Sequence, residues 1–351
     1  MNWRSTWERI THWELWHYFV KYYFIAPFWL WYCLRSGSLW FFSSSNPTLT
    51  FGGFEGEGKK EMYDQLPAGT FPVTIYISPG RDFDSVKKAL AEKNLNYPLV
   101  VKPDAGSKGL LFRKIDNEAE LISYHQKMPV EYLAQQLITY PYELSVFYYR
   151  FPNRQKGVIT GLIEKDLLHV KGNGKDNLLE LIQMHPTAKY RVDELKLKHE
   201  NSFNVIIPKG ELFILTYAAN LSRGARFTHL EHLIDEDLLK VFDDLSLYTS
   251  FYYGRYDLKC LSLNDLKGGK NFSILEFNGS GAEPNHIYHQ GYSLLQAYKV
   301  IIFHWKILYQ ISKYNHRHGY PYWSFSRGNK FLKEAKKYLR VLEKFEKEIL
   351  V

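Results

Sequence analysis

Acidic, basic and amide side chains with period-two spacing occupy two short segments late in the chain. Residues 254–259 read GRYDLK and residues 274–280 read ILEFNGS, and the turn-rich stretch between them predicts a hairpin. If Asp257 pairs with Glu276 across it, Asn278 lies on the same face, because side chains alternate along a strand. Two carboxylates and a carboxamide are hard oxygen ligands that suit Mg²⁺.

Two basic residues are placed to bind phosphate groups. Arg255 would share the face of Asp257, where a guanidinium binds a phosphoryl oxygen or a developing oxyanion. Lys102 lies near the end of the predicted strand 97–103, ahead of the loop 104–109, DAGSKG. Glycines in such a loop let backbone N–H groups approach phosphate oxygens, and the lysine supplies the compensating charge. Neither a P-loop motif nor a GxGxxG motif occurs in the sequence.

Taken one at a time, these residues have ordinary explanations. Lys102 can be a solvated lysine at a strand end, Glu143 a surface acid, and Asp257 with Arg255 a neighbouring charge pair. Together they favour a ligand site, because acids, an arginine and an asparagine on one face of a sheet are costly unless a cation or ligand satisfies them.

The elements that must position these residues belong to an α+β domain. Short β-rich runs alternate with helical runs, and no internal repeat is visible. Residues 71–78 predict a strand and residues 83–93 predict a helix. We expect an aromatic-rich N-terminal segment over residues 1–54, the α+β domain over 55–295, and C-terminal helices over 296–351.

Five segments, in order, resemble the ATP-grasp superfamily, in particular the carboxylate–amine ligases related to D-alanine–D-alanine ligase and cyanophycin synthetase. They are YPLVVKP with its Gly/Ser loop, QQLITYPYELSV, NLSRGA, GRYDLK and ILEFNGS. The resemblance covers roughly residues 55–295, and the last two segments are its most specific part. It implies an ATP-grasp fold of two α+β subdomains that hold ATP between them, with the loop 104–109 as a lid over the phosphates.

Carried over to matching positions, the resemblance assigns a nucleotide site and a metal site. Lys102 matches the lysine at the ATP phosphates, and Glu143 matches the carboxylate that accepts the ribose hydroxyls. The backbone of residues 135–138 matches the hinge strand that meets adenine. The implied nucleotide-binding set is Lys60 (or its neighbour Lys59), Lys102, Gly106, Ser107, Gly109, Gln135, Leu137, Ile138, Glu143 and Asn220. The implied Mg²⁺ ligands are Asp257, Glu276 and Asn278.

The same resemblance implies catalytic and substrate residues. Arg255 and Lys102 match the residues that stabilise developing negative charge. The turn that follows the metal segment reads the acceptor in relatives, and NLSRGA lines the cleft. The implied substrate residues are Arg223, Ser280, Glu283 and His286.

The activity implied is that of an ATP- and Mg²⁺-dependent carboxylate–amine ligase acting through an acyl phosphate. No nucleophilic side chain is needed, so Cys33 and Cys260 are expected to be passive. Two alternatives remain open. One is a nucleotide-binding membrane adaptor without catalysis, and the other is an ATP-grasp kinase without an amine acceptor.

The start of the chain stands apart in composition. Seven of the nine Trp lie in the first 40 residues, and the uncharged run 22–34 has only thirteen residues, whereas a membrane-spanning helix needs about 20. No cleavage site of small residues marks it as a signal peptide. Trp and Tyr favour the membrane–water boundary, so we expect an interfacial segment whose basic residues meet anionic lipid. Packing of these aromatics on the protein body or in a homodimer interface stays open.

The formal net charge of +8 lies mainly at the two ends of the chain. Residues 327–351 carry a net +4 and residues 1–42 a net +2. The middle has no arginine-rich stripe, which argues against a nucleic-acid partner. Apolar residues spaced by three and four predict helices over 292–313 and 331–349.

Two cysteines form no disulfide framework, which favours a reducing compartment. We therefore expect a cytoplasmic protein at the inner face of a membrane, with small-molecule or lipid-linked carboxylate and amine substrates.

Overall fold

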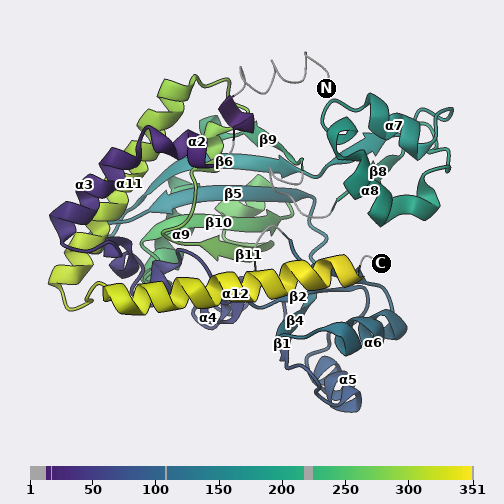
Figure 1. Cartoon of the computed structure of the whole chain (residues 1–351), viewed down its shortest axis with the longest axis horizontal. Helices are drawn as coiled ribbons and strands as arrows, with labels where there is room; N and C mark the ends of the chain where they lie inside the picture. The colour runs from purple at the N-terminus through teal and green to yellow at the C-terminus, as the bar shows by residue number, and fades with distance from the viewer. Residues whose placement is uncertain (1–12, 17, 107–108, 217–223, 350–351) are drawn as a thin grey trace.

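The computed structural model of the chain describes residues 13–16, 18–106, 109–216 and 224–349. Helices and antiparallel sheets are mixed along the chain, so the predicted α+β class is confirmed (Figure 1). Three sheets are present in these ranges, with strand orders β1-β4-β2-β3, β11-β10-β5-β6-β9 and β7-β8.

The strands are short, and all pair antiparallel. Their bounds are β1 Thr74–Ile77, β2 Leu99–Pro103, β3 Arg113–Ile115, β4 Tyr132–Gln136, β5 Tyr142–Tyr149, β6 Val158–Asp166, β7 His169–Lys171, β8 Leu212–Ile214, β9 Arg226–His229, β10 Tyr253–Cys260 and β11 Phe272–Asn278.

Two long helices end the chain, and shorter ones connect the strands. The α-helices are α2 Tyr18–Tyr23, α3 Ala26–Ser36, α4 Lys59–Tyr63, α5 Phe83–Glu92, α6 Glu118–Lys127, α7 Leu178–Met184, α8 Val192–His199, α9 Glu236–Thr249, α10 Leu263–Lys267, α11 Leu294–Arg317 and α12 Phe325–Ile349. Single 3₁₀ turns include η1 Trp13–Leu15, η2 Phe41–Ser44, η3 Thr50–Gly52, η4 Ala188–Arg191, η5 Glu200–Ser202, η7 Glu231–Leu233 and η8 Asn285–Ile287.

The four-stranded sheet is covered by α5 and α6. Asp82 and Asn117 begin these helices, and each side chain accepts a hydrogen bond from the backbone N–H three residues on. Such caps satisfy N–H groups that have no partner inside the helix. Val86 and Leu90 of α5 then pack with Val101 of β2 in one buried cluster.

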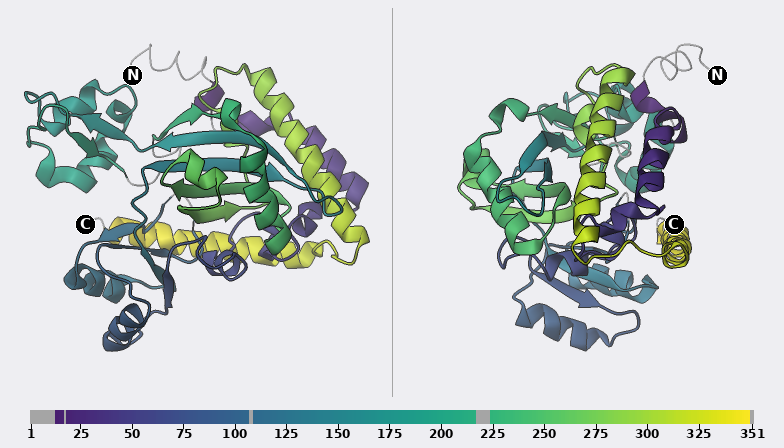
Figure 2. Two further views of the ribbon diagram at one scale, coloured as in Figure 1. Left: turned by 180° about the vertical axis from the view of Figure 1, so that it is seen from behind. Right: turned by 90° about the vertical axis from the view of Figure 1, so that its left-hand side faces the viewer.

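The five-stranded sheet is buried on both faces. Tyr148 and Tyr256 pack against Phe242 of α9 on one face. The view from behind shows helix α9 lying across this face (Figure 2). The alternate residue Phe147 points to the opposite face, where it joins a cluster with α11. Because side chains alternate along a strand, this second face also carries the polar residues of the candidate site.

Residues between β6 and β9 form a small third unit that the sequence analysis does not separate from the rest. The pair β7–β8 packs with α7 and α8 around its own buried cluster, which includes Leu178, Ile182 and Leu195. Figure 1 shows this unit beside one end of the large sheet. It is small, and its core does not merge with the larger clusters.

The aromatic N-terminal segment has two kinds of face. Ile25, Cys33 and Phe41 are buried, and Trp29 lies edge-on to Trp305 of α11 at a centroid distance of 5.1 Å. Other side chains of α2, α3 and the turn between them are exposed, by 46–77 per cent; they include Phe19, Tyr23, Phe24, Phe28, Leu30, Trp31 and Leu34. Within the described residues, no helix is both long and apolar enough to cross a bilayer.

Helix α12 runs across the molecule and contacts both ends of it (Figure 1). Phe331 packs with Phe51 in the aromatic cluster at a centroid distance of 5.4 Å. Leu342, three turns further on, belongs to the core of the four-stranded sheet. The predicted helices over 292–313 and 331–349 are thus present as α11 and α12, while the predicted turn 263–271 contains the short helix α10.

Candidate active site

The predicted hairpin is confirmed as strands β10 and β11. Asp257 lies opposite Glu276, and Arg255 lies opposite Asn278. A register irregularity follows Asp257, so the pairing resumes with Leu258 opposite Ile274. The alternation of side chains therefore places the two carboxylates, the arginine and the asparagine on one face.

Asp257 is the centre of a buried charge network. Its carboxylate accepts a hydrogen bond from Ser145 Oγ at 2.6 Å and is 2.9 Å from Lys165 Nζ. Arg255 donates to both carboxylate oxygens, at 3.2 Å each, and Asn278 Nδ2 lies 3.4 Å from Oδ2. Burial alone would raise the pKa of Asp257, but Arg255, Lys165 and Ser145 hold it well below its ordinary range.

Lys165 is a site residue that the sequence analysis missed. It lies in β6, and its side chain is only 6 per cent exposed. The signal was available, because a lysine two positions after the buried Ile163 must point to the same face of the sheet as that residue. Its ion pair with Asp257 explains how a buried ammonium is tolerated there.

A cavity of about 140 Å³ lies in front of this network, between the two larger sheets. It is lined by Glu276 and Asn278 of β11, by Gly106 of the loop after β2, and by the stretch that leads into α4. The complete lining is Leu49, Phe54, Glu55, Gly56, Glu57, Gly58, Lys59, Met62, Gly106, Glu276, Phe277 and Asn278.

Lys59 lines this cavity, and Lys102 lies close enough to be affected by the charges of Lys59 and Glu276. Lys59 Nζ is 3.8 Å from Glu276 Oε1 and donates to the carbonyl oxygen of Asp104 at 3.2 Å. Burial, reinforced by the charge of Lys59, lowers the pKa of Lys102 to about 7, while Glu276 and Glu143 act in the opposite direction. Lys102 therefore loses much of its charge at neutral pH until an anion joins it.

Lys60 lies differently from its neighbour. Its ammonium contacts Asp64 at 2.5 Å on the surface, and its side chain is 49 per cent exposed. Successive helical residues point in different directions, about 100° apart, so only one lysine of the pair faces the cavity. Of the two candidates for the earlier nucleotide-contacting lysine, the structure places Lys59 in the cluster.

Glu57 is a further group that the sequence analysis did not single out. Burial raises its pKa to about 7, and the nearby charge of Glu276 adds to this, while Lys59 opposes it. Glu57 lies in a glycine-rich stretch, GGFEGEG, ahead of α4. The glycines on both sides of Glu55 and Glu57 could have indicated a functional stretch in the sequence. Glycine lets the backbone approach a site closely and so bring a neighbouring side chain to it.

The other residues of the implied nucleotide site lie around this cavity or outside the described residues. Gln135 is buried in β4 and donates through Nε2 to Thr74 Oγ1 at 2.8 Å. Leu137 and Ile138 follow β4 and connect the two larger sheets. Burial raises the pKa of Glu143, which lies opposite Lys259 on β10. Gly109 has a positive φ of 67°. Ser107, Asn220 and Arg223 fall outside the described residues.

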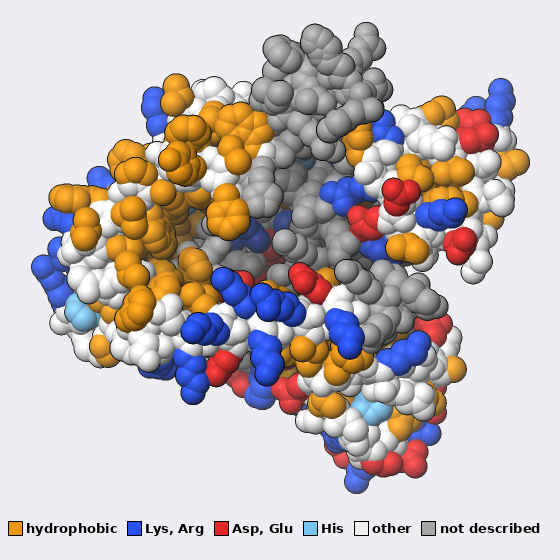
Figure 3. Space-filling model, in the orientation of Figure 1, with side chains coloured by type: hydrophobic (Ala, Val, Ile, Leu, Met, Phe, Trp, Pro, Cys, Tyr) orange, Lys and Arg blue, Asp and Glu red, His pale blue; other side chains and the backbone are white. Residues whose placement is uncertain are grey.

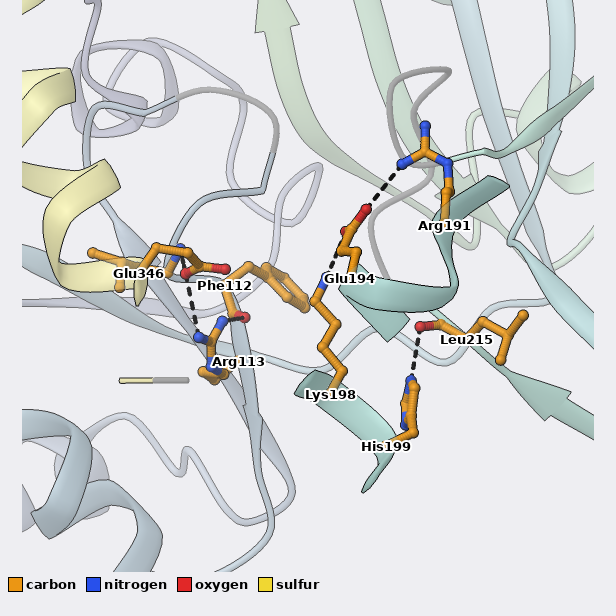
Figure 4. Close-up of polar contacts among 9 residues, drawn as sticks. Phe112, Arg113, Arg191, Glu194, Lys198, His199, Leu215 and Glu346 are labelled. Carbon is orange, nitrogen blue, oxygen red and sulfur yellow. Dashed lines mark hydrogen bonds and ion pairs between the residues drawn. The ribbon is translucent and has the colours of Figure 1, made fainter. Parts of the chain in front are cut away.

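The loop after β2 is held at its far end by α12 (Figure 4). Glu346 is 8 per cent exposed; it accepts a hydrogen bond from the backbone N–H of Leu111 at 2.8 Å and pairs with Arg113 at 3.2 Å. A side chain added at Gly106 would meet Leu342 of α12 at 3.6 Å. The C-terminal helix thus fixes one side of the predicted phosphate lid.

The predicted substrate turn, residues 279–289, follows β11. Ser280 is buried, and its Oγ has no hydrogen-bond partner among the described residues. Arg255 Nη1 donates to the backbone oxygen of Glu283 at 3.1 Å, and Asn285 Nδ2 donates to Ser145 Oγ at 3.1 Å. This turn is therefore bonded directly to the network around Asp257.

His286 faces a second cavity, of about 490 Å³, on the side of the turn near α11. Burial lowers the pKa of His286 to about 3 and that of His304 to about 4, so both imidazoles are neutral at pH 7. His304 Nδ1 lies 2.7 Å from the carbonyl oxygen of Val300 and therefore carries the proton. Nε2 then accepts from Thr160 Oγ1 at 2.9 Å.

The donor set fits Mg²⁺, with unequal roles for its members. Glu276 and Asn278 line the cavity, and the Glu276 side chain is 39 per cent exposed. Asp257 already accepts from two cations and a hydroxyl. Of the three predicted Mg²⁺ ligands, Glu276 and Asn278 thus face the cavity, and Asp257 lies outside its lining. Hard oxygen donors of this kind suit Mg²⁺, which keeps water and phosphate oxygens as its other ligands.

No protein-family model matches the chain, and no curated protein matches its sequence. Among solved structures, a bifunctional glutathione synthetase from Pasteurella multocida matches with 18% identity and a TM-score of 0.36, over 67% of this chain and 34% of that one. The ATP-grasp ligase PsnB matches with 12% identity and a TM-score of 0.36, over 69% and 57%.

A D-alanine–D-alanine ligase from Bacillus anthracis complexed with ATP matches with 13% identity and a TM-score of 0.40, over 74% of this chain and 66% of that one. The chain thus spans less than two thirds of the length of each of these three proteins. One of these solved structures, PsnB, is an ATP-grasp ligase.

Proposed function

We propose that this protein is an ATP- and Mg²⁺-dependent carboxylate–amine ligase that works through an acyl phosphate. The observation that carries the proposal is one cavity in which Lys59 faces the carboxylate of Glu276 and the carboxamide of Asn278, with Lys102 near enough to respond to the charges of Lys59 and Glu276. Behind them, Arg255 and Asp257 form a buried ion pair. Cations and metal ligands that converge in this way suit a nucleotide triphosphate.

Each group has a role in this proposal. Lys102 and Lys59 would offset the charge of the phosphates, and Lys102 would regain a full charge when an anion binds beside it. Glu276 and Asn278 would hold Mg²⁺, which supplies charge neutralisation at the phosphoryl oxygens when it is bound. Arg255 would stabilise the oxyanion at the carboxyl carbon, because its guanidinium reaches the backbone of the substrate turn.

The proposed reaction consists of two successive displacement steps. A carboxylate oxygen of the substrate attacks the γ-phosphorus, and the bond from that phosphorus to the oxygen of ADP breaks. The amine nitrogen, after losing one proton, attacks the carbonyl carbon. The bond from that carbon to the phosphate oxygen then breaks, and phosphate leaves with the electron pair. A second proton leaves the nitrogen, giving the amide.

The test uses purified protein, ATP, Mg²⁺ and a panel of carboxylates, with hydroxylamine as a general nucleophile. We expect ADP release that depends on one class of carboxylate, with formation of the matching hydroxamate. In Glu276→Gln both signals should fall by about a hundredfold or more, as expected when a charge that holds the metal is removed. If Glu276→Gln released ADP as fast as the wild-type protein, this result would contradict the site assignment.

The products separate this function from the two alternatives. A phosphate ester without a hydroxamate identifies a kinase. ATP binding without turnover across the panel identifies a non-catalytic adaptor. The exposed Glu276 and the buried Arg255 favour catalysis, because a purely structural site has no need of a charged group open to a cavity.

We further propose that the protein works at an anionic membrane surface on an amphiphilic or lipid-linked substrate. The exposed apolar side chains of α2 and α3 gather on one face, and basic side chains line α12 beside them (Figure 3). The exposed basic residues of α12 are Arg327, Lys330, Lys333, Lys336, Lys337, Arg340 and Lys344. Aromatic residues favour the lipid boundary, and lysines favour anionic headgroups.

A triple variant tests the membrane contact. Phe24, Trp31 and Leu34 are exposed by 62, 54 and 77 per cent, so replacing all three with serine should leave the fold intact. The loss of about 2 kcal/mol of apolar burial should weaken binding to phosphatidylserine-containing vesicles about 30-fold. Added salt should weaken wild-type binding as well, because the basic contribution is screened.

The matched control replaces three exposed apolar side chains of the small unit, Met184, Leu197 and Ile206, which are exposed by 60, 61 and 55 per cent. Vesicle binding should be unchanged in this control. An equal loss in both variants, or no binding by the wild-type protein, would contradict the membrane proposal.

A further inference from the structure

The N-terminal segment is bonded to the substrate turn, not merely packed near it. Tyr22 of α2 donates its hydroxyl to Glu283 Oε1 at 2.6 Å, and Tyr288 donates to the same oxygen at 2.7 Å. Lys21, next to Tyr22, donates to the Tyr288 hydroxyl at 2.8 Å. Residues more than 250 positions apart in the sequence thus share one hydrogen-bonded cluster, and it is centred on a carboxylate.

This cluster adjoins the catalytic network. The backbone oxygen of Glu283 accepts a hydrogen bond from Arg255 at 3.1 Å, and Arg255 in turn pairs with Asp257. The loop ahead of α4 also packs closely against this turn. A Cβ atom added at Gly279 would lie only 2.5 Å from the Gly52 carbonyl oxygen. A group held by Glu283 would therefore lie beside the residues assigned to the reacting carbonyl.

Helix α2 divides its side chains between this cluster and the exterior. Lys21 and Tyr22 point toward the substrate turn, whereas Phe19 and Tyr23 are exposed by 76 and 72 per cent, as is Phe24 just after the helix, by 62 per cent. An α-helix with its side chains is about 10 Å across. The apolar exterior and the polar cluster are therefore within reach of one ligand that has a polar head and an apolar tail.

We propose that α2 forms one wall of the acceptor site, where Tyr22 and Lys21 position Glu283 to bind the primary amino group of an amphiphilic amine. The apolar part of that amine rests on the exposed face of α2 and α3. This inference rests on the proposed function, whose second substrate it names. It assigns the catalytic role to Glu283 and makes Tyr22 and Lys21 positioning residues.

The chemistry of the carboxylate favours an amine. A carboxylate offers about four acceptor positions on two oxygens, and here both phenol donors use Oε1. Among the described residues, no hydrogen bond to Oε2 is formed. An ammonium group carries three donors and a full charge, so it matches a fixed carboxylate better than a hydroxyl group does.

The cluster also limits competition from the protein's own lysine. Burial lowers the pKa of Lys21, against the opposing charges of Glu283 and Glu14, and its ammonium is engaged by the Tyr288 hydroxyl. The bound ammonium would pass one proton to Glu283 and attack the acyl phosphate with the freed electron pair. The C–N bond forms, the C–O bond to phosphate breaks with its electron pair on phosphate, and the second proton leaves to solvent.

The experiment measures equilibrium binding of dodecylamine to the full-length protein by tryptophan fluorescence, below the micelle concentration. Dodecanol, with the same chain and no amino group, is the comparison ligand. We expect tighter binding of dodecylamine by about tenfold or more in the wild-type protein, and loss of this preference in Glu283→Gln. Tyr22→Phe should reduce the preference several-fold, because one donor that orients Glu283 is lost.

Tyr248→Phe is the matched control, because Tyr248 of α9 is 68 per cent exposed and α9 packs on the opposite face of the five-stranded sheet. It should leave the preference for the amine unchanged, and all three variants should keep the wild-type melting temperature. Equal binding of dodecylamine and dodecanol by the wild-type protein, or an unchanged preference in Glu283→Gln, would overturn the inference.

ATP binding, measured separately, distinguishes the two proposals. If ATP does not bind but the amine preference follows Glu283 and Tyr22, the proposed function fails while the amine site stands. If ATP binds and turns over but the amine preference is absent, the ligase proposal stands and the acceptor assignment fails.

Discussion

Replacing Asp257 with asparagine is expected to lower the free energy of unfolding by about 3–5 kcal/mol, without any ligand present. The aspartate carboxylate pairs with Lys165 at 2.9 Å and with Arg255 at 3.2 Å. An amide of the same size removes the negative charge and leaves two buried cations facing each other. The melting temperature should fall by roughly 5–15 °C, which differential scanning calorimetry measures directly.

Glu276→Gln is the matched control for this prediction, because it makes the same change on the same sheet face. The Glu276 side chain is 39 per cent exposed, and its nearest lysine nitrogen is 3.8 Å away. Its stability cost should stay within about 1 kcal/mol, as for other partly exposed pairs. If Asp257→Asn left the free energy of unfolding unchanged or raised it, the main role of Asp257 would not be to stabilise the buried network. Asp257 would then be a carboxylate held in an unfavourable environment for metal binding.

Binding of an ATP analogue is expected to be accompanied by proton uptake at Lys102. Burial and Lys59 lower the pKa of this lysine to about 7, so at pH 8 most of it is neutral in the free protein. A polyphosphate beside it favours the charged form and raises its pKa again. Calorimetric titrations in buffers of different ionisation enthalpy should show uptake approaching one proton per nucleotide at pH 8, decreasing toward pH 6.

Lys102→Met should abolish this uptake and weaken nucleotide binding about 10- to 100-fold, as expected for a lost charge-assisted contact. Lys60→Met, at the exposed neighbour of Lys59, should leave proton uptake and nucleotide affinity unchanged.

The lowered pKa of Lys102 also makes the stability of the free protein depend on pH. Between about pH 7 and pH 10 the unfolded chain binds more protons at this lysine than the folded protein, so the free energy of unfolding should rise with pH in that window. Nucleotide binding without proton uptake would show that Lys102 does not meet the phosphates.

The parts of the site that the sequence predicts are those set by local periodicity. Strand alternation is enough to place Asp257, Glu276 and Asn278 on one face, and the pairing of Asp257 with Glu276 is as expected. The choice between Lys59 and Lys60 depends on the rotation of α4 relative to β11, which a sequence does not specify. Alternation along β6 can place Lys165 on the inner face, but its pairing with Asp257 is not predicted by any local pattern, because Asp257 lies 92 positions away on another strand.

Contacts between distant segments account for the rest. The bond between Tyr22 and Glu283 joins residues 261 positions apart, and no local pattern predicts it. The small unit around β7 and β8 was missed because its strands have only three residues each, below the length at which alternation is visible.

The composition of the aromatic N-terminal segment left two interpretations open, packing on the protein body and contact with a membrane. Each interpretation describes one face of the segment. Trp29 and Phe41 pack on α11, in agreement with an aromatic layer on the protein body. Trp31 and Leu34 remain exposed, as a membrane-facing surface requires. Composition gives the number of aromatic residues, whereas the helical rotation that sorts them between two faces depends on the partner helix.

The most direct test of carboxylate activation follows oxygen atoms. A carboxylate that supports ADP release is labelled with ¹⁸O at both oxygens and incubated with the protein, ATP, Mg²⁺ and an amine. If the carboxylate is activated as an acyl phosphate, one labelled oxygen must appear in the inorganic phosphate released. Unlabelled phosphate, with both labelled oxygens retained in the organic product, would contradict the proposed mechanism.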